Sequence, residues 1–284
     1  MICFYHSADL DGHCSGALVK RAFPECEMIG INYGDEFPWE KIEREIVYMV
    51  DFALQPFKQM DRVNMLAEEF FWIDHHKSAI EESAKFPRIR GLRQYNKAAC
   101  ELVWAYLVDA TSLPPLFIRL LGRYDVWDHS DPRTLPFQFG MRQFPDTRPE
   151  GDFNWENLFD EIAVNKIIRK GEIILDYITS ENTKYAVAAA FETELDGLRC
   201  IAINKLLTNS QIFDSVWDQE KYDAMLTFGW RAGGFWTVSL YTDKPGVDVS
   251  VVAKARGGGG HAQAAGFQCG PILPFLPLSG LLPG

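Results

Sequence analysis

The sequence of 284 residues lacks the cysteine patterns that mark zinc knuckles and thioredoxin-like sites. Its six cysteines form no CxxC or CxC pair, so core packing in a reducing compartment is the role expected of each. No stretch approaches 18 consecutive apolar residues, and the N-terminus shows no basic region followed by an apolar run. These absences predict a cytoplasmic protein without a membrane anchor.

Positive charge is also scarce. The chain has 28 Lys and Arg residues against 39 Asp and Glu residues, a formal net charge of −11, and residues 181–284 contain only 8 of the basic residues. This balance excludes a protein that coats long nucleic acids or a membrane surface through bulk electrostatics. An anionic ligand is therefore expected to be held at one local site.

The chain has no low-complexity segment, and its composition of 47% hydrophobic and 24% charged residues is that of a globular protein. Its length favours two domains. We predict a first domain over residues 1–154, a connecting helix over 155–184 and a smaller domain over 185–284. The Pro- and Leu-rich tail that ends the chain is too short to span a membrane.

The first half alternates short apolar runs with helix-like segments, which predicts an α/β fold with a mostly parallel sheet and helices on both faces. The expected strands are Met1–Tyr5, Ile46–Val50 and Phe70–Ile73. The expected helices are Gly12–Phe23, a segment opened by Pro56 at its first helical position, Ala98–Val108, Leu116–Tyr124 and the long amphipathic stretch Trp155–Thr179.

The second half has the pattern of a smaller α+β domain. Ala188–Glu194 and Leu198–Ile203 flank Asp196-Gly197, and Ala224–Arg231 and Phe235–Tyr241 flank a second glycine turn, so both pairs predict β-hairpins. Short helices are expected at Gln211–Trp217 and Val249–Ala255.

Acidic and imidazole side chains gather at the ends of the predicted strands, where the carboxyl ends of parallel strands converge on one crevice. Several buried carboxylates cannot all stay ionised without cations between them, and oxygen ligands mixed with imidazole favour Mn²⁺, Mg²⁺ or Fe²⁺. Each segment alone has a simpler explanation, because Asp11 would also cap a helix and Asp51 would also form a turn. The residues concerned are His6, Asp9, Asp11, Asp51, Asp74, His75 and His76.

These segments resemble the motifs of the DHH phosphoesterase superfamily. WIDHHKS resembles its Asp-His-His signature, HSADLDG and VDFALQP its first and second motifs, and RYDVWDH its fourth. GGGGHAQAAGF, from Gly257 to Phe267, is similar to the glycine loop of the accessory domain, DHHA1. Within the superfamily the sequence looks most like the branch of short-oligoribonucleases and cyclic-nucleotide phosphodiesterases.

The resemblance implies two divalent metal ions. His6, Asp9 and Asp51 would bind one, and Asp11, Asp51, His75 and Asp125 the other, with Asp51 as the bridge. His76 and Asp74 would be the catalytic pair: His76 faces the phosphate, and Asp74 orients the imidazoles. Asp128 is an alternative fourth-motif ligand, and His13 is either a substrate contact or a solvated or capping residue.

The glycine loop is expected to hold a substrate phosphate through exposed backbone N–H groups and the positive end of a helix at His261–Ala265. Tyr241 occupies a position where relatives have Arg; it would stack on a base or pack in the core. The expected substrate-binding residues are Gly258, Gly259, Gly260, His261, Arg256, Lys77 and Tyr241, with Lys254 nearby.

Together these features predict an enzyme that hydrolyses phosphodiester or phosphomonoester bonds of short RNA or DNA oligonucleotides or small nucleotides with a two-metal-activated hydroxide. Mn²⁺ is the expected metal, with Mg²⁺, Co²⁺ and Fe²⁺ as alternatives. Other functions stay open: a cyclic mono- or dinucleotide phosphodiesterase, an exopolyphosphatase or pyrophosphatase, and a nucleotide-binding module with an inactive metal site. A homodimer is likewise open.

Overall fold

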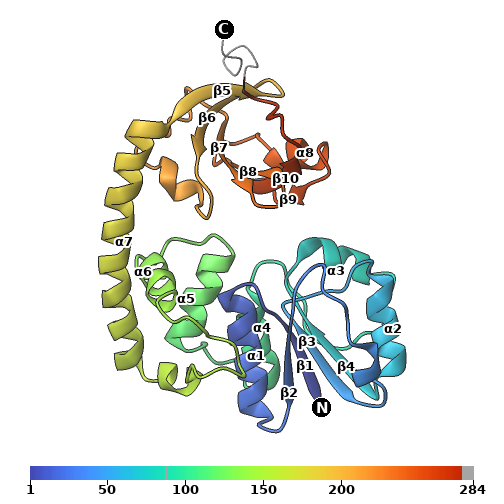
Figure 1. Cartoon of the computed structure of the whole chain (residues 1–284). Coiled ribbons are helices and arrows are strands. Elements are labelled where there is room, and N and C mark those ends of the chain that lie inside the picture. The colour runs from blue at the N-terminus through green and yellow to red at the C-terminus, as the bar shows by residue number, and fades with distance from the viewer. Residues whose placement is uncertain (87, 277–284) are drawn as a thin grey trace. The chain divides into compact units, whose positions relative to one another are not determined.

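The computed structural model describes residues 1–86 and 88–276, and the chain divides into two compact units, Met1–Leu175 and Asp176–Gly284 (Figure 1). The division falls inside helix α7 (Glu161–Ala189). The domain limits inferred from the sequence stay predictions. The last eight residues of the Pro- and Leu-rich tail lie outside the described residues.

Unit 1 is built on a four-stranded parallel sheet with the strand order β2-β1-β3-β4. In the central strands Tyr5 pairs with Val50, and Val50 pairs with Ile73, so the carboxyl ends of three neighbouring strands are level. This register places whatever follows each strand at the same edge of the sheet. The strands are β1 (Ile2–His6), β2 (Glu27–Ile31), β3 (Ile46–Val50) and β4 (Glu69–Ile73).

Helices cover both faces of this sheet, as predicted. Alternate residues of β1 point to opposite faces: Cys3 and Tyr5 join one buried cluster with α1, α4 and α5, while Ile2 and Phe4 join a second cluster with α2 (Figure 1). A strand buried on both sides must be apolar throughout, which explains the uninterrupted ICFY run. The helices of this unit are α1 (Leu10–Ala22), α2 (Lys58–Leu66), α3 (Lys77–Ser83), α4 (Ala99–Leu107), α5 (Leu116–Asp125), α6 (Thr134–Met141) and the first part of α7, with 3-10 turns η1 (Trp39–Lys41) and η2 (Trp155–Phe159).

Three local expectations for unit 1 were wrong or incomplete. Strand β2 went unpredicted because its apolar residues are interrupted by Gly30 and it lies at the sheet edge, where Ile31 is its one buried residue. Pro56 does not open α2; its peptide bond with Gln55 is cis, and the helix begins at Lys58. The predicted helix from Trp155 is two elements, because η2 ends at Phe159 before α7 begins.

Unit 2 contains a six-stranded sheet with the order β5-β6-β7-β8-β10-β9, and both predicted hairpins are confirmed. Asp196 and Gly197 both have positive φ, as a tight hairpin turn requires. The elements are β5 (Phe191–Leu195), β6 (Leu198–Asn204), η3 (Ser210–Phe213), β7 (Ala224–Arg231), β8 (Phe235–Tyr241), α8 (Val249–Lys254), β9 (Gly259–Gly260) and β10 (Ala264–Cys269).

Two helices predicted for unit 2 are absent from the described residues. Gln211–Trp217 forms only η3, because adjacent Ile212 and Phe213 are both buried rather than spaced along one helical face. The segment after the glycine loop is strand β10, paired with β8, since Ala265 and Phe267 alternate into the core. The helix expected at His261–Ala265 was therefore wrong.

The structure also describes the cysteines and the lengths of the helices. All six cysteines are free, and five of them are buried. Among the described residues, helices long and apolar enough to cross a membrane are not found.

Helices α6 and α7 approach each other at two glycines. A Cβ on Gly171 would lie 1.7 Å from the Pro136 carbonyl oxygen, and one on Gly140 would lie 2.3 Å from the Ile167 carbonyl oxygen. Both obstacles are backbone atoms, so relief requires the helices to separate.

We therefore expect Gly171→Ala to lower the free energy of unfolding by about 1–3 kcal/mol, although alanine is the better helix former by up to about 1 kcal/mol. Urea denaturation measures the change. Gly270→Ala, where no atom lies within 4 Å of the new Cβ, is the control and should be neutral. Equal stability of the two variants would contradict the close approach.

Candidate metal centre

The six predicted metal ligands lie together at the carboxyl edge of the unit 1 sheet. They form two groups in which one ligand atom from each residue lies within 4.8 Å of the others, and each group could hold a metal ion. His6 ends β1, Asp51 follows β3, His75 follows β4 and Asp125 ends α5. The two groups are His6, Asp9 and Asp51, and Asp11, His75 and Asp125.

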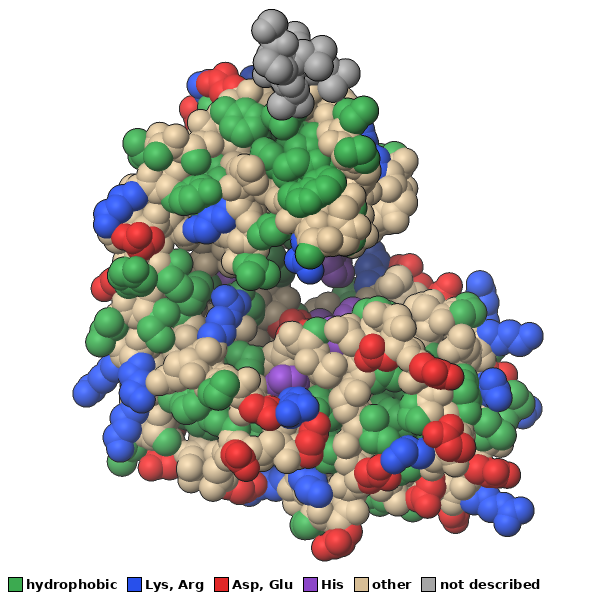
Figure 2. All heavy atoms as spheres, viewed as in Figure 1, with side chains coloured by type: hydrophobic (Ala, Val, Ile, Leu, Met, Phe, Trp, Pro, Cys, Tyr) green, Lys and Arg blue, Asp and Glu red, His purple; other side chains and the backbone are tan. Residues whose placement is uncertain are grey.

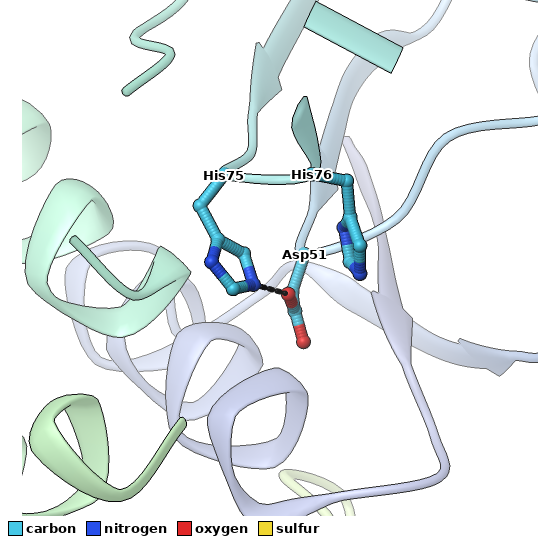
Figure 3. A group of neighbouring side chains, drawn as sticks. All are labelled: Asp51, His75 and His76. Carbon is cyan, nitrogen blue, oxygen red and sulfur yellow. Dashed lines mark ion pairs between the residues drawn. The ribbon is translucent and has the colours of Figure 1, made fainter. Parts of the chain in front are cut away.

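Asp51 belongs to the first group and also lies close to His75 of the second. Its Oδ2 is 3.6 Å from His6 Nδ1, and its Oδ1 is 3.3 Å from His75 Nε2 (Figure 3). His6 Nδ1 is also 3.0 Å from Asp9 Oδ2, and His75 Nε2 is 3.2 Å from Asp125 Oδ2. This central position is the one that a bridging carboxylate requires.

The first motif builds its loop through backbone contacts. Asp9 caps α1, its Oδ1 accepting a hydrogen bond from the Gly12 N–H at 2.9 Å. A Cβ on Gly12 would lie 2.0 Å from the His6 carbonyl oxygen, so only glycine allows the helix to start this close to β1. Asp11 caps a different helix than expected: its carboxylate accepts from the N–H groups of Ala99 and Cys100 at the start of α4.

Asp74 fixes the orientation of the histidines. Its Oδ1 accepts hydrogen bonds from the His75 N–H and from His76 Nδ1, each at 2.7 Å, while Trp72 Nε1 donates to its Oδ2 at 3.2 Å. The carboxylate is fully buried. His76 thus keeps Nε2 on the side of Asp51, with which it and His75 form a third group of potential ligands (Figure 3).

The electrostatics of the centre show uncompensated negative charge. Burial and the nearby Asp11 carboxylate raise the pKa of Asp51 and of Asp125 well above the usual range. Burial would lower the pKa of the imidazoles, but Asp51 and Asp9 outweigh it at His6, whose pKa rises to about 10. Asp74 likewise raises the pKa of His76 to about 8.

The residues present fit divalent cations. His6 Nδ1 and Asp51 Oδ1 are buried and lie 3.0 Å from Asp9 Oδ2 and 3.3 Å from His75 Nε2, but neither atom makes a hydrogen bond of good geometry among the described residues. This is a costly state that a cation would relieve. Asp51 lies outside the regular secondary structure, and its φ of 56 is a left-handed conformation that directs its side chain into the centre. Carboxylate and imidazole ligands are those of Mn²⁺ and Fe²⁺ rather than of structural thiolate zinc.

Curated relatives share most of the chain. It is 25% identical over 308 residues to oligoribonuclease NrnB of Bacillus subtilis strain 168, covering 94% of this chain and 72% of that protein. It is 27% identical over 271 residues to uncharacterized protein R106 of Acanthamoeba polyphaga mimivirus, covering 87% of this chain but spanning only 58% of the relative's length. No family model matches the chain.

Solved structures give the fold. The chain is similar to PggH, a pGpG-specific phosphodiesterase from Vibrio cholerae, with 14% identity and a TM-score of 0.52 over 95% of this chain and 93% of that one. It is similar to the DHH domain of PF0399, with 15% identity and a TM-score of 0.51 over 93% and 81%. The chain therefore shares its fold with PggH and with the DHH domain of PF0399.

Two further candidate residues, His13 and Asp128, lie outside the cluster. His13 bonds to Thr147 Oγ1 at 2.7 Å and to the Ser7 carbonyl at 3.1 Å, so its ring ties together two loops. Asp128 is exposed, accepts from the Ser130 N–H and lies 3.4 Å from Arg123. The structure therefore places Asp125, and not Asp128, beside His75.

The DHHA1-like loop is shaped by strand packing. A Cβ on Gly258 would lie 2.1 Å from the Gly266 carbonyl oxygen, and Gly260 has φ 135, so both glycines are needed for the turn into β10. Gly259 has open space around it, and His261 is exposed in the turn. The segment that follows the loop is strand β10 and not the expected helix, and the N-terminus of α8 lies against the loop instead, with the Val249 N–H donating to the Ala262 carbonyl at 2.9 Å.

The other predicted substrate contacts already have partners. Arg256 forms a two-pronged ion pair with Asp196, and Tyr241 packs against a buried cluster of unit 2 with its hydroxyl 3.4 Å from the Thr208 carbonyl. Lys77 is exposed at the start of α3, 3.9 Å from Glu81. Their substrate roles stay predictions.

Sequence reasoning missed Tyr33, which follows β2. Its ring lies 5.9 Å from that of His6 and 4.8 Å from that of Phe52, and it is 52% exposed. Partial burial, followed by the charges of Asp74 and Asp51, raises the pKa of its hydroxyl to about 12. Because β2 was not predicted, nothing in the sequence placed this loop beside the metal ligands.

Asp51→Asn tests whether the centre is built for cations. A carboxyl group whose folded pKa lies above its unfolded pKa destabilises the protein at neutral pH, so its removal should stabilise the metal-free protein by about 1 kcal/mol or more. Asparagine tolerates the left-handed backbone. The wild type should gain about 3 kcal/mol with Mn²⁺ at 100 times its dissociation constant, and the variant should gain far less.

Thermal unfolding with and without Mn²⁺ measures both effects. Asp128→Asn is the matched control, because it changes an exposed aspartate in the same motif, and it should behave like the wild type. A wild-type protein with the same melting temperature in both conditions would contradict the metal centre.

Proposed function

We propose that this protein is a metal-dependent phosphoesterase that hydrolyses short oligonucleotides or small nucleotides. One observation carries the proposal: the buried Asp51 belongs to one group of potential metal ligands, with His6 and Asp9, and its Oδ1 lies 3.3 Å from His75 Nε2 of the other group. The relationship to an oligoribonuclease supports the substrate class. The ligands expected for the two cations are His6, Asp9, Asp11, Asp51, His75 and Asp125.

Two bound divalent cations would lower the pKa of water and neutralise charge on the phosphoryl oxygens. The chain supplies the rest of the site. Asp74 holds His76 Nδ1, so Nε2 is the nitrogen available to a phosphate. In its protonated form His76 can donate a charged hydrogen bond from Nε2 to a phosphoryl oxygen.

Small substrates with few phosphates suit the distribution of basic residues better than polyphosphate does. In unit 2, Arg199 and Lys244 both pair with Asp223, Arg256 pairs with Asp196, and Lys221 pairs with Glu192. On the face drawn in Figure 2, basic and acidic side chains of the described residues are interspersed over unit 1. A polyanion would meet an acid beside most of these cations.

Manganese is the metal we propose. Asp11 already accepts two backbone hydrogen bonds, so its carboxylate would be shared between these N–H groups and a cation. A site of mixed carboxylates and imidazoles is suited to Mn²⁺ or Fe²⁺, whereas Mg²⁺ prefers an all-oxygen shell.

We expect Mn²⁺-supported hydrolysis of RNA of two to five residues, or of a 3′,5′-bisphosphonucleoside, at least about tenfold faster than that of cyclic AMP, a cyclic dinucleotide or polyphosphate. Product formation at matched concentrations is the measurement, with EDTA as the control that abolishes it. Preference for polyphosphate would overturn the substrate class. Metal binding without turnover of any substrate would instead favour the binding module.

Asp125→Asn and Asp128→Asn form a matched pair within one motif. The first removes a carboxylate 3.2 Å from His75 and should reduce Mn²⁺-dependent turnover more than about 100-fold, since weaker changes around metal sites already cost 10- to 100-fold. The second keeps the oxygen that accepts from Ser130 and should stay within about twofold of the wild type. Equal loss in both variants would contradict the assignment of Asp125.

A further inference from the structure

Trp127 has a backbone conformation that its side chain does not favour. Its φ is 60, in the left-handed region that glycine and asparagine adopt most readily, and its side chain is 55% exposed. It stands two residues after Asp125, at the C-terminal end of α5. A bulky aromatic residue in such a conformation calls for an explanation.

The turn itself does not supply one. Its backbone is held by hydrogen bonds from the Trp127 N–H to the Tyr124 carbonyl at 3.2 Å and from the Asp128 N–H to the Arg123 carbonyl at 2.8 Å. Glycine or asparagine would make the same hydrogen bonds with less strain. The indole adds little burial, so folding alone gives no reason for tryptophan here.

The surroundings of the indole suggest a ligand. Its ring meets the His129 ring edge-on at 5.9 Å, and His129 lies 6.1 Å from the ring of Tyr124, whose hydroxyl accepts from Arg142 at 2.9 Å. The indole of Trp127 thus contacts His129 on one side and is exposed to solvent elsewhere. Strained residues held in place by their surroundings gather at ligand sites.

We propose that Trp127 stacks on a nucleobase of the substrate. The phosphate of that substrate would be held at the proposed metal centre, to which the neighbouring Asp125 and His75 belong. This inference rests on the proposed function and adds a residue that distinguishes nucleotides from other phosphoesters. An exposed aromatic face stacks on any base with little sequence preference. Trp127 follows Asp125 by two residues, at the end of the same helix.

The test compares three variants on two substrates in Mn²⁺. Trp127→Asn removes the ring and suits the left-handed backbone, Trp127→Phe keeps a ring, and Leu207→Asn is the matched control. Leu207 is also an apolar residue with positive φ, 55, and is 97% exposed, but it lies in unit 2 and has no aromatic face. The substrates are the dinucleotide pApA and its analogue with hydrogen in place of both bases.

Trp127→Asn should raise KM for pApA between about 5- and 150-fold, the equivalent of about 1–3 kcal/mol of stacking, with kcat changed less than about twofold. It should leave kinetics on the base-free analogue unchanged, and its melting temperature should equal or exceed that of the wild type. Trp127→Phe should restore most of the affinity. Leu207→Asn should alter neither KM nor kcat.

Three results would overturn the inference. An unchanged KM for pApA in Trp127→Asn would exclude stacking. An equal rise on both substrates would show that the ring acts on the loop around Asp125 and not on a base. A wild-type protein that hydrolyses neither substrate would overturn the proposed function and this inference with it. If the wild type hydrolyses both substrates and the variants behave like it, the inference alone is overturned.

Discussion

The structure depends on one electrostatic constraint, the gathering of four carboxylates from three chain segments at one edge of a parallel sheet. Asp51 and Asp11 are almost fully buried, and burial, followed by repulsion from Asp11, raises the pKa of Asp51. Such a cluster is unfavourable unless positive charge is placed within it. In the metal-free protein imidazolium groups provide part of that charge, and in the proposed enzyme cations would replace them.

The fold keeps this charged cluster in place with hydrogen bonds from N–H groups. Asp9 caps α1, Asp11 caps α4, and Asp74 binds the backbone of His75 and the ring of His76. The backbone N–H donors among these do not titrate. Ligand orientation follows from helix starts and strand ends, and this preorganisation is what a metal centre requires.

Much of the centre was predictable because strand ends in parallel sheets converge. His6, Asp51 and His75 each follow an apolar run, and the runs are regular enough to locate from the sequence alone. Strand β2 and the loop bearing Tyr33 were not predicted, because an edge strand buries little and the short apolar run of β2 is broken by Gly30. The strand after the glycine loop was mistaken for a helix, since AQAAGF is compatible with either and only pairing with β8 decides.

The sequence by itself determined the α/β class and the order of elements around the centre, since these depend on local periodicity. The resemblance of its motifs singled out the candidate ligands that the structure brings together. Only the tertiary structure decided which carboxylate does what. Asp9 and Asp11 are two residues apart and chemically alike, yet one caps its own helix while the other reaches across to α4. That difference arises from the packing of α1 against α4, a contact between residues nearly ninety positions apart that no local pattern records.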